Sequence, residues 1–331
     1  MGEKIIVALA TDHKYRYYTA VTLYSILQHA STDTNYEILL LEENLSEEDL
    51  GIFTSLIDGK ENFLLTVIDM QAKIREIGAD RFHLGTYAIP IFYRLFLPEM
   101  LPQYDKVIYL DSDIIVRSDI KKLYYTAIGD FPLAAGLDIG ASSIPLNLAE
   151  LNAYWYCRRV LGLRKSNRYF NSGVLIMDLQ KMRKSDFPQR IRTEISNSSH
   201  FVFPDQDILN RIFDGKVFYL DKTWNYMTQR NGRRLAKYSI LHFAGVHPWL
   251  SINLPHSEFW WEAAEKSLLA EKIRQENYGT PEQMRYYEGI DKSYRRVIDS
   301  PCWRYTAIFR KLKNLTGFIG KCISNRRSAY K

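Results

Sequence analysis

The stretch from residue 105 to 117, DKVIYLDSDIIVR, constrains the fold of this chain more than any other. Two short apolar runs, rich in β-branched and aromatic residues, flank the polar residues Asp111, Ser112 and Asp113. An apolar run bounded by charge is typical of a buried strand in a parallel sheet. Because an unpaired buried carboxylate is costly, we expect both aspartates at the end of the strand, facing a cation or solvent.

The spacing of these two carboxylates suits a metal ion. Residues two apart on a strand point to the same face, so Asp111 and Asp113 can converge on one ion. Carboxylate oxygens are ligands that hard divalent ions such as Mg²⁺ and Mn²⁺ prefer. The alternative interpretation is an acidic turn between two strands that binds nothing, since a bare D-x-D is common.

Length and composition place the chain among globular α/β proteins. Its 331 residues, 46% of them apolar, suffice for one large domain or two smaller ones. The widely spaced Cys157, Cys302 and Cys322 argue against a disulfide framework and favour a reducing compartment. Charge follows the N-terminal apolar run too soon for a signal peptide or transmembrane helix. The chain lacks GxGxxG, Walker A, HExxH and GxSxG motifs.

The order of predicted elements indicates a doubly wound, mostly parallel sheet flanked by helices. The predicted strands lie at residues 4–11, 36–41, 63–68, 131–137, 169–179 and 239–249, in addition to the central stretch. The predicted helices lie at residues 17–29, 44–57, 87–97, 147–163, 204–213 and 258–276. Ser46 would cap the second helix, with Asp49 as its capping-box partner. Ligands of such sheets bind at the carboxyl ends of the strands, where Asp12 and the two later aspartates could meet.

Five motifs carry a resemblance to a known family. In order they are Asp12 after the first strand, YLDSDIIV, YFNSGVL, PDQDILN, and HFAG followed by PW. From about residue 4 to 250 the chain resembles the retaining GT-A glycosyltransferases of family 8, which include bacterial lipopolysaccharide galactosyl- and glucosyltransferases and glycogenin. The resemblance implies transfer of galactose or glucose from a UDP-sugar to a lipopolysaccharide-type or other cell-surface glycan or glycolipid acceptor.

The resemblance also implies roles for particular residues. The metal, Mn²⁺ or alternatively Mg²⁺, would be bound by Asp111, Asp113 and His242. The residues implied beside the anomeric carbon, and therefore in catalysis, are Asn171, Asp205 and Gln206. The other residues implied around the UDP-sugar are Ala10 and Asp12 at the uracil, Arg94 and Asp138 at the sugar, Ser112 between the metal ligands, and Gly245 and His247 near the diphosphate.

Two departures from the family pattern concern the donor site. Lys14 stands where the family usually has Asn, and the loop from Gly245 to Trp249 is one residue shorter than the usual G-x-x-K-P-W and has no Lys. His247 would take the place of that Lys, although its side chain is shorter and only partly charged near pH 7. Retention would use either a covalent intermediate, with Asp205 as the candidate nucleophile, or front-face attack.

Each candidate also has a structural interpretation. His242 in an apolar strand could be a hydrogen-bonded core histidine, and Asn171 could cap a strand. Asp205 could be an ordinary acidic residue of a helix N-terminus. Arg94 could lie on a solvated helix face. The ordered motifs favour the functional interpretation over these.

The last part of the chain is strongly basic. From Lys292 onward there are eleven Lys and Arg residues against Asp299 alone, which leaves residues 1–291 mildly acidic. Apolar residues recur every three or four positions after Pro301, which predicts a basic amphipathic helix for an anionic membrane surface. We expect a GT-A domain at 1–255, a helical extension at 256–291 and a membrane-association tail at 292–331. A cytoplasmic protein held at the inner face of the cell membrane, with no nucleic-acid partner, fits these features.

Two other functions remain as alternatives. One is a non-catalytic protein that binds a nucleotide sugar or is recruited to a membrane, which the missing Lys favours. The other is a metal-dependent nucleotidyltransferase, which would consume a nucleoside triphosphate instead of a UDP-sugar.

Overall fold

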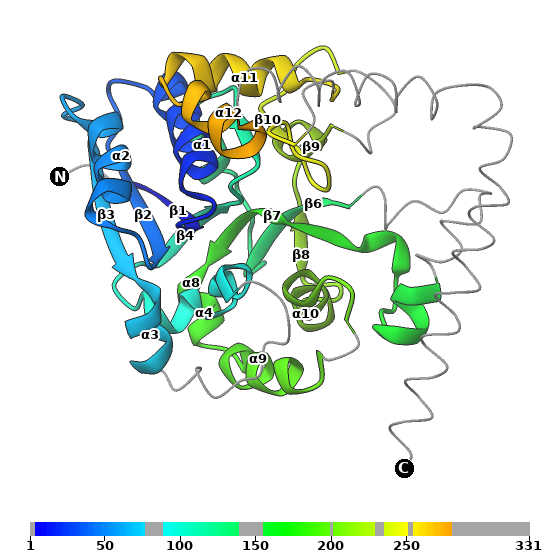
Figure 1. Cartoon of the computed structure of the whole chain (residues 1–331). Coiled ribbons are helices and arrows are strands. Elements are labelled where there is room, and N and C mark those ends of the chain that lie inside the picture. The colour runs from blue at the N-terminus through cyan, green and yellow to red at the C-terminus, as the bar shows by residue number, and fades with distance from the viewer. Residues whose placement is uncertain are drawn as a thin grey trace, which may run out of the picture.

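A computed structural model of the chain describes residues 4–76, 89–138, 155–198, 201–228, 235–250 and 254–279. A central sheet runs through the molecule, with helices on both of its faces (Figure 1). The helices α1, α11 and α12 lie on one face, and α4, α8, α9 and α10 lie on the other (Figure 1). The predicted α/β architecture is therefore confirmed.

The first half of the sheet is built from alternating strands and helices. These are β1 (Ile5–Asp12), α1 (Arg16–His29), β2 (Tyr36–Glu43), α2 (Glu47–Ile57), β3 (Phe63–Asp69) and α3 (Met70–Glu76). The strands pair in parallel, with β1 between β2 and the later strand β4 (Lys106–Leu110). The predicted cap of α2 is present, because Ser46 and Asp49 exchange both capping-box hydrogen bonds.

The large sheet has the order β3-β2-β1-β4-β7-β6-β8. Its second half contains β6 (Leu133–Leu137), β7 (Phe170–Asp178) and β8 (Val217–Tyr219). Only β7 runs against its neighbours β4 and β6, so the sheet is mostly parallel, as predicted. Because β7 is reversed, its first residues lie at the edge where β1 and β4 end.

The central stretch forms two strands, where a single interrupted strand was expected. After β4 the chain turns at Asp111–Asp113 and enters β5 (Ile114–Val116), which belongs to a second sheet of order β5-β10-β9. The partners of β5 are β10 (Ile240–His242) and β9 (Tyr226–Met227). The acidic turn between two strands is therefore real, and it joins two sheets.

Several predicted helices differ from the structure. The helix expected at 87–97 begins with the short 3₁₀ helix η2 (Ile89–Phe92) and continues as α4 (Tyr93–Met100), so the expected end before Pro98 is wrong. Almost all of α4 is buried, and its packing outweighs the single backbone donor that Pro98 removes. Of the helix expected at 147–163, the described part contains the π-helix η3 (Tyr156–Val160), and residues 147–154 lie outside the described part.

The remaining elements follow in chain order. They are α5 (Lys121–Tyr124), the 3₁₀ helix η4 (Ser166–Arg168), α8 (Leu179–Arg183), α9 (Phe187–Ser196), α10 (Pro204–Ile212), the 3₁₀ helix η6 (Lys222–Asn225), α11 (Ser257–Lys266) and α12 (Ala270–Tyr278). The predicted single helix at 258–276 is thus two helices. Leu268 lies between them with a φ of 61°, a left-handed conformation that turns the chain.

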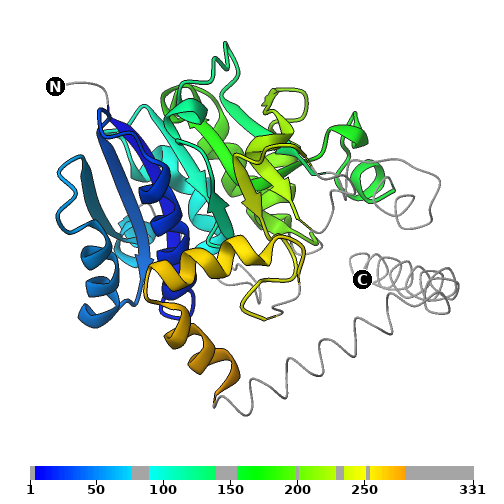
Figure 2. The same cartoon turned by 90° about the horizontal axis from the view of Figure 1, so that it is seen from above.

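The helical extension packs on α1. Glu276 pairs with Arg16, and Tyr18 donates a hydrogen bond of 3.1 Å to Asn277. Figure 2 shows α11 in yellow beside α1, with α12 following it in orange. No helix of the described ranges combines the length and the apolar character needed to cross a membrane. The predicted basic helix after residue 300 lies outside the described residues.

Candidate donor and metal site

One edge of the large sheet collects the candidate residues. Asp12 ends β1, Asp111 follows β4, and Asn171 is the second residue of the reversed strand β7. The backbone N–H of Asp111 donates to the carbonyl oxygen of Gly173 at 2.9 Å, which ties the end of β4 to the beginning of β7. The sheet topology alone therefore brings together polar residues from three distant parts of the sequence.

Helix α1 holds the acidic turn in place. Thr22 donates hydrogen bonds of 2.9 Å to the carbonyl oxygens of Ser112 and Ile114. Thr19 donates to the hydroxyl of Ser112 at 2.9 Å, and that hydroxyl donates to the carbonyl oxygen of Ala10 at 3.0 Å. Thr19 and Thr22 are fully buried, so the backbone of the turn is satisfied by side chains of the helix below it.

Asp111, Asp113 and His242 form a candidate metal centre. One ligand atom from each residue lies within 4.8 Å of the other two. The Nε2 atom of His242 is 3.2 Å from Asp113 Oδ1 and 3.9 Å from Asp111 Oδ2. Asp113 Oδ1 is buried and makes no hydrogen bond among the described residues, as expected for an oxygen that serves an ion. The pair of carboxylates predicted from the sequence is thus joined by a histidine from β10.

Gly173 leaves the space that an ion needs between these residues. A Cβ atom at this position would lie 2.5 Å from Asp111 Oδ2 and 3.0 Å from His242 Nε2. Any larger residue would therefore fill the cradle between the carboxylate and the imidazole. Two carboxylates and one imidazole around such a gap fit a divalent ion of the Mn²⁺ or Mg²⁺ type.

The charge state of the site is consistent with cation binding. Burial alone would raise the pKa of the Asp113 carboxyl, but the adjacent His242 and His247 rings outweigh it and hold that pKa below its usual range. Asp113 is therefore a carboxylate at neutral pH. An ionised carboxylate is the form that ligates a metal.

Arg94 connects the metal centre to Asp205. Its guanidinium donates to Asp111 Oδ1 at 2.7 Å and pairs with Asp205 Oδ2 at 3.3 Å. It also donates to the carbonyl oxygen of Ser172 at 2.7 Å and lies over the Tyr109 ring, 4.3 Å from its centroid. Burial would lower the pKa of Arg94, but Asp111 and Asp205 outweigh it and raise that pKa. Arg94 is only 4% exposed, so it does not lie on a solvated helix face.

Asp205 is a buried carboxylate in the first turn of α10. The hydroxyl of Ser172 donates to its Oδ2 at 2.9 Å. Burial raises the pKa of the Asp205 carboxyl, while Arg94 opposes this rise and Asp111 adds to it. Asp205 is therefore buried against other polar groups of the site and is not an exposed acid at a helix N-terminus.

Gln206, Asn171 and Asp138 form a hydrogen-bonded row beside Asp205. Gln206 Oε1 accepts from Asn171 Nδ2 at 3.0 Å, and Gln206 Nε2 donates to Asp138 Oδ2 at 3.2 Å. All three residues are buried. The structure thus brings together Asn171, Asp205 and Gln206, the three residues predicted beside the anomeric carbon.

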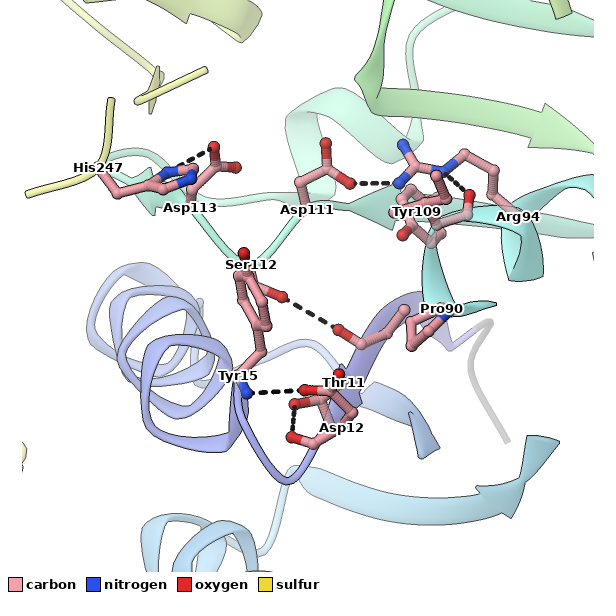
Figure 3. A pocket seen from close by; sticks show the side chains of 12 residues that line it. Thr11, Asp12, Tyr15, Pro90, Arg94, Tyr109, Asp111, Ser112, Asp113 and His247 are labelled. Atoms are coloured by element: carbon pink, nitrogen blue, oxygen red, sulfur yellow. Dashed lines mark hydrogen bonds and ion pairs between the residues drawn. The ribbon is translucent and has the colours of Figure 1, made fainter. Parts of the chain in front are cut away.

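A cavity of about 230 Å³ lies between the end of β1 and the acidic turn that follows β4 (Figure 3). The predicted site residues that line it are Ala10, Asp12, Arg94, Asp111, Ser112, Asp113 and His247. Asp12 lies at its far end and accepts a hydrogen bond of 2.8 Å from the backbone N–H of Tyr15 (Figure 3). The predicted residues outside its lining are Asp138, Asn171, Asp205, Gln206, His242 and Gly245.

His247, which we expect to take the place of the family's Lys, lies beside Asp113. Its ring stacks on Trp249 with centroids 4.5 Å apart, and Trp249 stacks on Tyr18 at 3.8 Å. This stack directs Nδ1 toward Asp113 Oδ2, 3.4 Å away (Figure 3). Gly245 has a φ of 113°, a conformation that residues with a side chain rarely adopt.

Sequence reasoning missed several residues that shape the site. Gly173 stands in the YFNSGVL motif and was given no role, although an isolated glycine inside a strand is a signal for close approach of other groups. Thr19 and Thr22 recur three residues apart within the apolar stripe of α1, and this spacing was the available signal. Nothing in the local sequence marked Tyr109 and Ser172 as partners of Arg94, because those contacts join distant segments.

The comparisons with known proteins agree with this geometry. The profile of the family described as Glycosyl transferase family 8 matches residues 6–253, three quarters of the chain. This chain belongs to glycosyltransferase family 8. The predictions of the family and of the GT-A fold are therefore confirmed, and residues 6–253 match a family of glycosyltransferases.

Individual relatives share about a quarter of their residues with this chain over the matched region. Glycosyltransferase GlyA of Streptococcus pneumoniae is 24% identical over 273 residues, which are 78% of this chain and 34% of GlyA. A Haemophilus influenzae protein is 27% identical over 223 residues, which are 66% of this chain and 62% of its own length. The chain thus spans less than two thirds of either relative.

A solved structure supports the fold. The galactosyltransferase LgtC, in complex with donor and acceptor sugar analogues, superposes with a TM-score of 0.60 at 24% sequence identity. The match covers 86% of this chain and all of LgtC. At this level of identity the likeness concerns the fold of family 8, and the substrates of this member have to be argued from its own residues.

Proposed function

We propose that this chain is a retaining hexosyltransferase that depends on Mn²⁺ and uses UDP-galactose or UDP-glucose as donor. The observation that carries the proposal is the joining of a metal-type cluster, Asp111, Asp113 and His242, to a cavity that ends at Asp12. A divalent ion bound there would supply positive charge for the diphosphate leaving group. Asp12 and Ala10 would contact the uracil at the other end of the cavity.

The side chains of Asn171, Gln206 and Asp205 would orient the donor sugar and set the charge around it. Asn171 and Gln206 are neutral and polar, so they can hold sugar hydroxyls without adding charge. Arg94 fixes the carboxylates of Asp111 and Asp205 at a set separation by pairing with both. We propose that Asp205 lies beside the anomeric carbon, with Asp138 holding the amide of Gln206 in the required orientation.

His247 would replace the Lys of related enzymes at the diphosphate. The stack on Trp249 and Tyr18 fixes its ring at the rim of the cavity next to Asp113. A ring held in one orientation loses less conformational entropy on binding than a flexible Lys would. This pre-organisation would compensate in part for the shorter reach of His247.

The acceptor would be a lipopolysaccharide-type or other cell-surface glycan or glycolipid. We propose that residues 292–331, with eleven basic residues against one acidic residue, hold the protein at the anionic inner face of the cell membrane. Each basic residue near such a surface contributes about 1 kcal/mol. The mildly acidic remainder of the chain would not be attracted to it.

A donor screen tests the proposed function. Purified protein with Mn²⁺ is incubated with each of a panel of UDP-sugars, and released UDP is measured with and without glycan acceptors. Turnover of UDP-galactose or UDP-glucose is expected. Tight binding of a UDP-sugar without release of UDP over hours would support the non-catalytic alternative. Consumption of a nucleoside triphosphate in place of a UDP-sugar would support nucleotidyl transfer.

A further inference from the structure

Asn225 lies between the metal centre and the sugar-side amides, and no motif pointed to it. It is the last residue of η6 and precedes β9, which pairs in parallel with β10 and so places Asn225 beside His242. It is 3% exposed. The register of β6 against β7 shifts between Ala135 and Leu137, and a Cβ atom on the intervening Gly136 would lie 2.8 Å from Asn225 Cβ. The absence of a side chain at Gly136 therefore makes room for Asn225.

The orientation of the Asn225 amide follows from the backbone. The N–H of Gly173 donates to the side chain of Asn171 at 3.0 Å, so the atom that accepts there is the oxygen Oδ1. The atom of Asn225 that lies 2.9 Å from the same oxygen must be a donor, which makes it Nδ2. The Oδ1 atom of Asn225 then faces His242 Nδ1 at a distance of 2.8 Å.

The tautomer of His242 follows in turn. An amide oxygen can only accept, so Nδ1 of His242 must carry a proton and donate it to Asn225. In the neutral ring the lone pair is then on Nε2, the atom that lies 3.2 Å from Asp113 Oδ1. A protonated Nε2 could not ligate an ion. The neutral Nδ1–H ring is therefore the form that can bind a metal between Asp111 and Asp113.

We propose that Asn225 is a positioning residue that sets His242 in its metal-binding tautomer, an inference that rests on the proposed metal-dependent function. The same amide connects His242 to Asn171, whose Nδ2 donates to Gln206. The backbone N–H of Ser172 also donates to Gln206 Oε1 at 3.0 Å. Backbone groups of β7 therefore fix the side chains of both Asn171 and Gln206. Asn225 thus makes the metal ligand and the sugar-side amides one hydrogen-bonded unit.

The tautomer can be measured without any metal. Long-range ¹⁵N–¹H NMR spectra of the metal-free protein at pH 8 distinguish Nδ1–H from Nε2–H rings, and His242→Gln identifies the signal. We expect a proton on Nδ1 in the wild type, whether or not the metal-free ring also holds a proton on Nε2 toward Asp113. Asn225→Ala should move the ring toward Nε2–H, the tautomer that an isolated imidazole side chain prefers. Asn225→Asp keeps an acceptor opposite Nδ1 and should retain Nδ1–H.

Metal affinity provides the second readout. Titration with Mn²⁺ should show a 10–100-fold larger dissociation constant for Asn225→Ala, the usual effect of losing a partner of a metal-binding histidine. The control is Asn62→Ala, which removes an amide that donates to the carbonyl oxygens of Ser31 and Thr34, remote from the site. It should leave both the tautomer and the affinity unchanged.

Three outcomes would overturn the proposal. They are a wild-type ring with no proton on Nδ1, wild-type protonation and affinity in a folded Asn225→Ala protein, and an equal loss of affinity in Asn62→Ala. If Asn225→Ala does not fold, the wild-type and Asn225→Asp spectra still decide the question. A wild-type protein that keeps Nδ1–H but neither binds Mn²⁺ nor turns over a UDP-sugar would refute the proposed function and not the tautomer.

Discussion

Gly173→Ala tests whether the space between Asp111 and His242 is needed for a metal. The added methyl group would begin 2.5 Å from Asp111 Oδ2, whereas ordinary contacts start near 3.4 Å, so the carboxylate would have to retreat by about 0.9 Å. Metal–ligand distances tolerate deviations of only about 0.2 Å. We therefore expect Mn²⁺ affinity to fall by at least about 10-fold, the lower end of what losing a partner of a ligand costs.

The same substitution should also destabilise the fold. Overpacking a buried site costs about 1–3 kcal/mol, which urea unfolding of the metal-free protein would measure. Gly51→Ala is the matched control, because Gly51 lies within α2 with nothing inside 4 Å of an added Cβ. It should stabilise by about 0.5–1 kcal/mol and leave the affinity for Mn²⁺ unchanged. Calorimetric titration that gives a folded Gly173→Ala protein wild-type affinity for Mn²⁺ would refute the reasoning.

Three further predictions concern other parts of the molecule. Asp12→Ala should raise the KM for the UDP-sugar severalfold with little change in kcat, because it removes binding that is uniform along the reaction path. A pure kcat defect in steady-state kinetics would contradict the role of Asp12. A protein ending at Asp291 should lose co-sedimentation with anionic vesicles, and equal binding by both lengths, or binding indifferent to salt, would count against the tail. Burial raises the pKa of Asp207 to about 6. Because this pKa is higher in the folded than in the unfolded protein, the free energy of unfolding keeps its full value below about pH 4. It falls as the pH rises through 6, by about 3 kcal/mol at most. Asp207→Asn should abolish this fall in urea unfolding, and an unchanged pH profile would show that Asp207 is not its source.

Those parts of the fold that depend on local patterns could be predicted from the sequence. The apolar runs of β1, β2 and β3, and the capping box at Ser46, are signals contained within a few residues. The break between α11 and α12 could not be predicted, because Leu268 is neither Gly nor Pro, so its left-handed conformation has no signal in the local sequence. The split of the central stretch into two strands likewise depends on distant partners, since β5 pairs with β10 far along the chain.

The candidate site divides in the same way. Asp111, Asp113 and His242 stand in motifs that can be recognised as a set, and the structure places their ligand atoms together. Arg94 was expected near the sugar, but its pairing with both Asp111 and Asp205 follows only from the tertiary arrangement. Asn225 had no signal of its own, because its importance comes from the orientation that the backbone of β7 gives to its amide.

We propose that the acidic turn at Asp111–Asp113 binds a metal ion that UDP-sugar turnover requires. The most direct test is the rate of UDP release by Asp113→Asn across a range of Mn²⁺ concentrations. The control is Asp33→Asn, the same chemical change in an exposed pair with Lys121. We expect Asp113→Asn to stay folded and to lose Mn²⁺-dependent turnover by several orders of magnitude, while Asp33→Asn keeps it. Full activity of Asp113→Asn at low Mn²⁺ would show that the acidic turn does not bind the ion required for turnover.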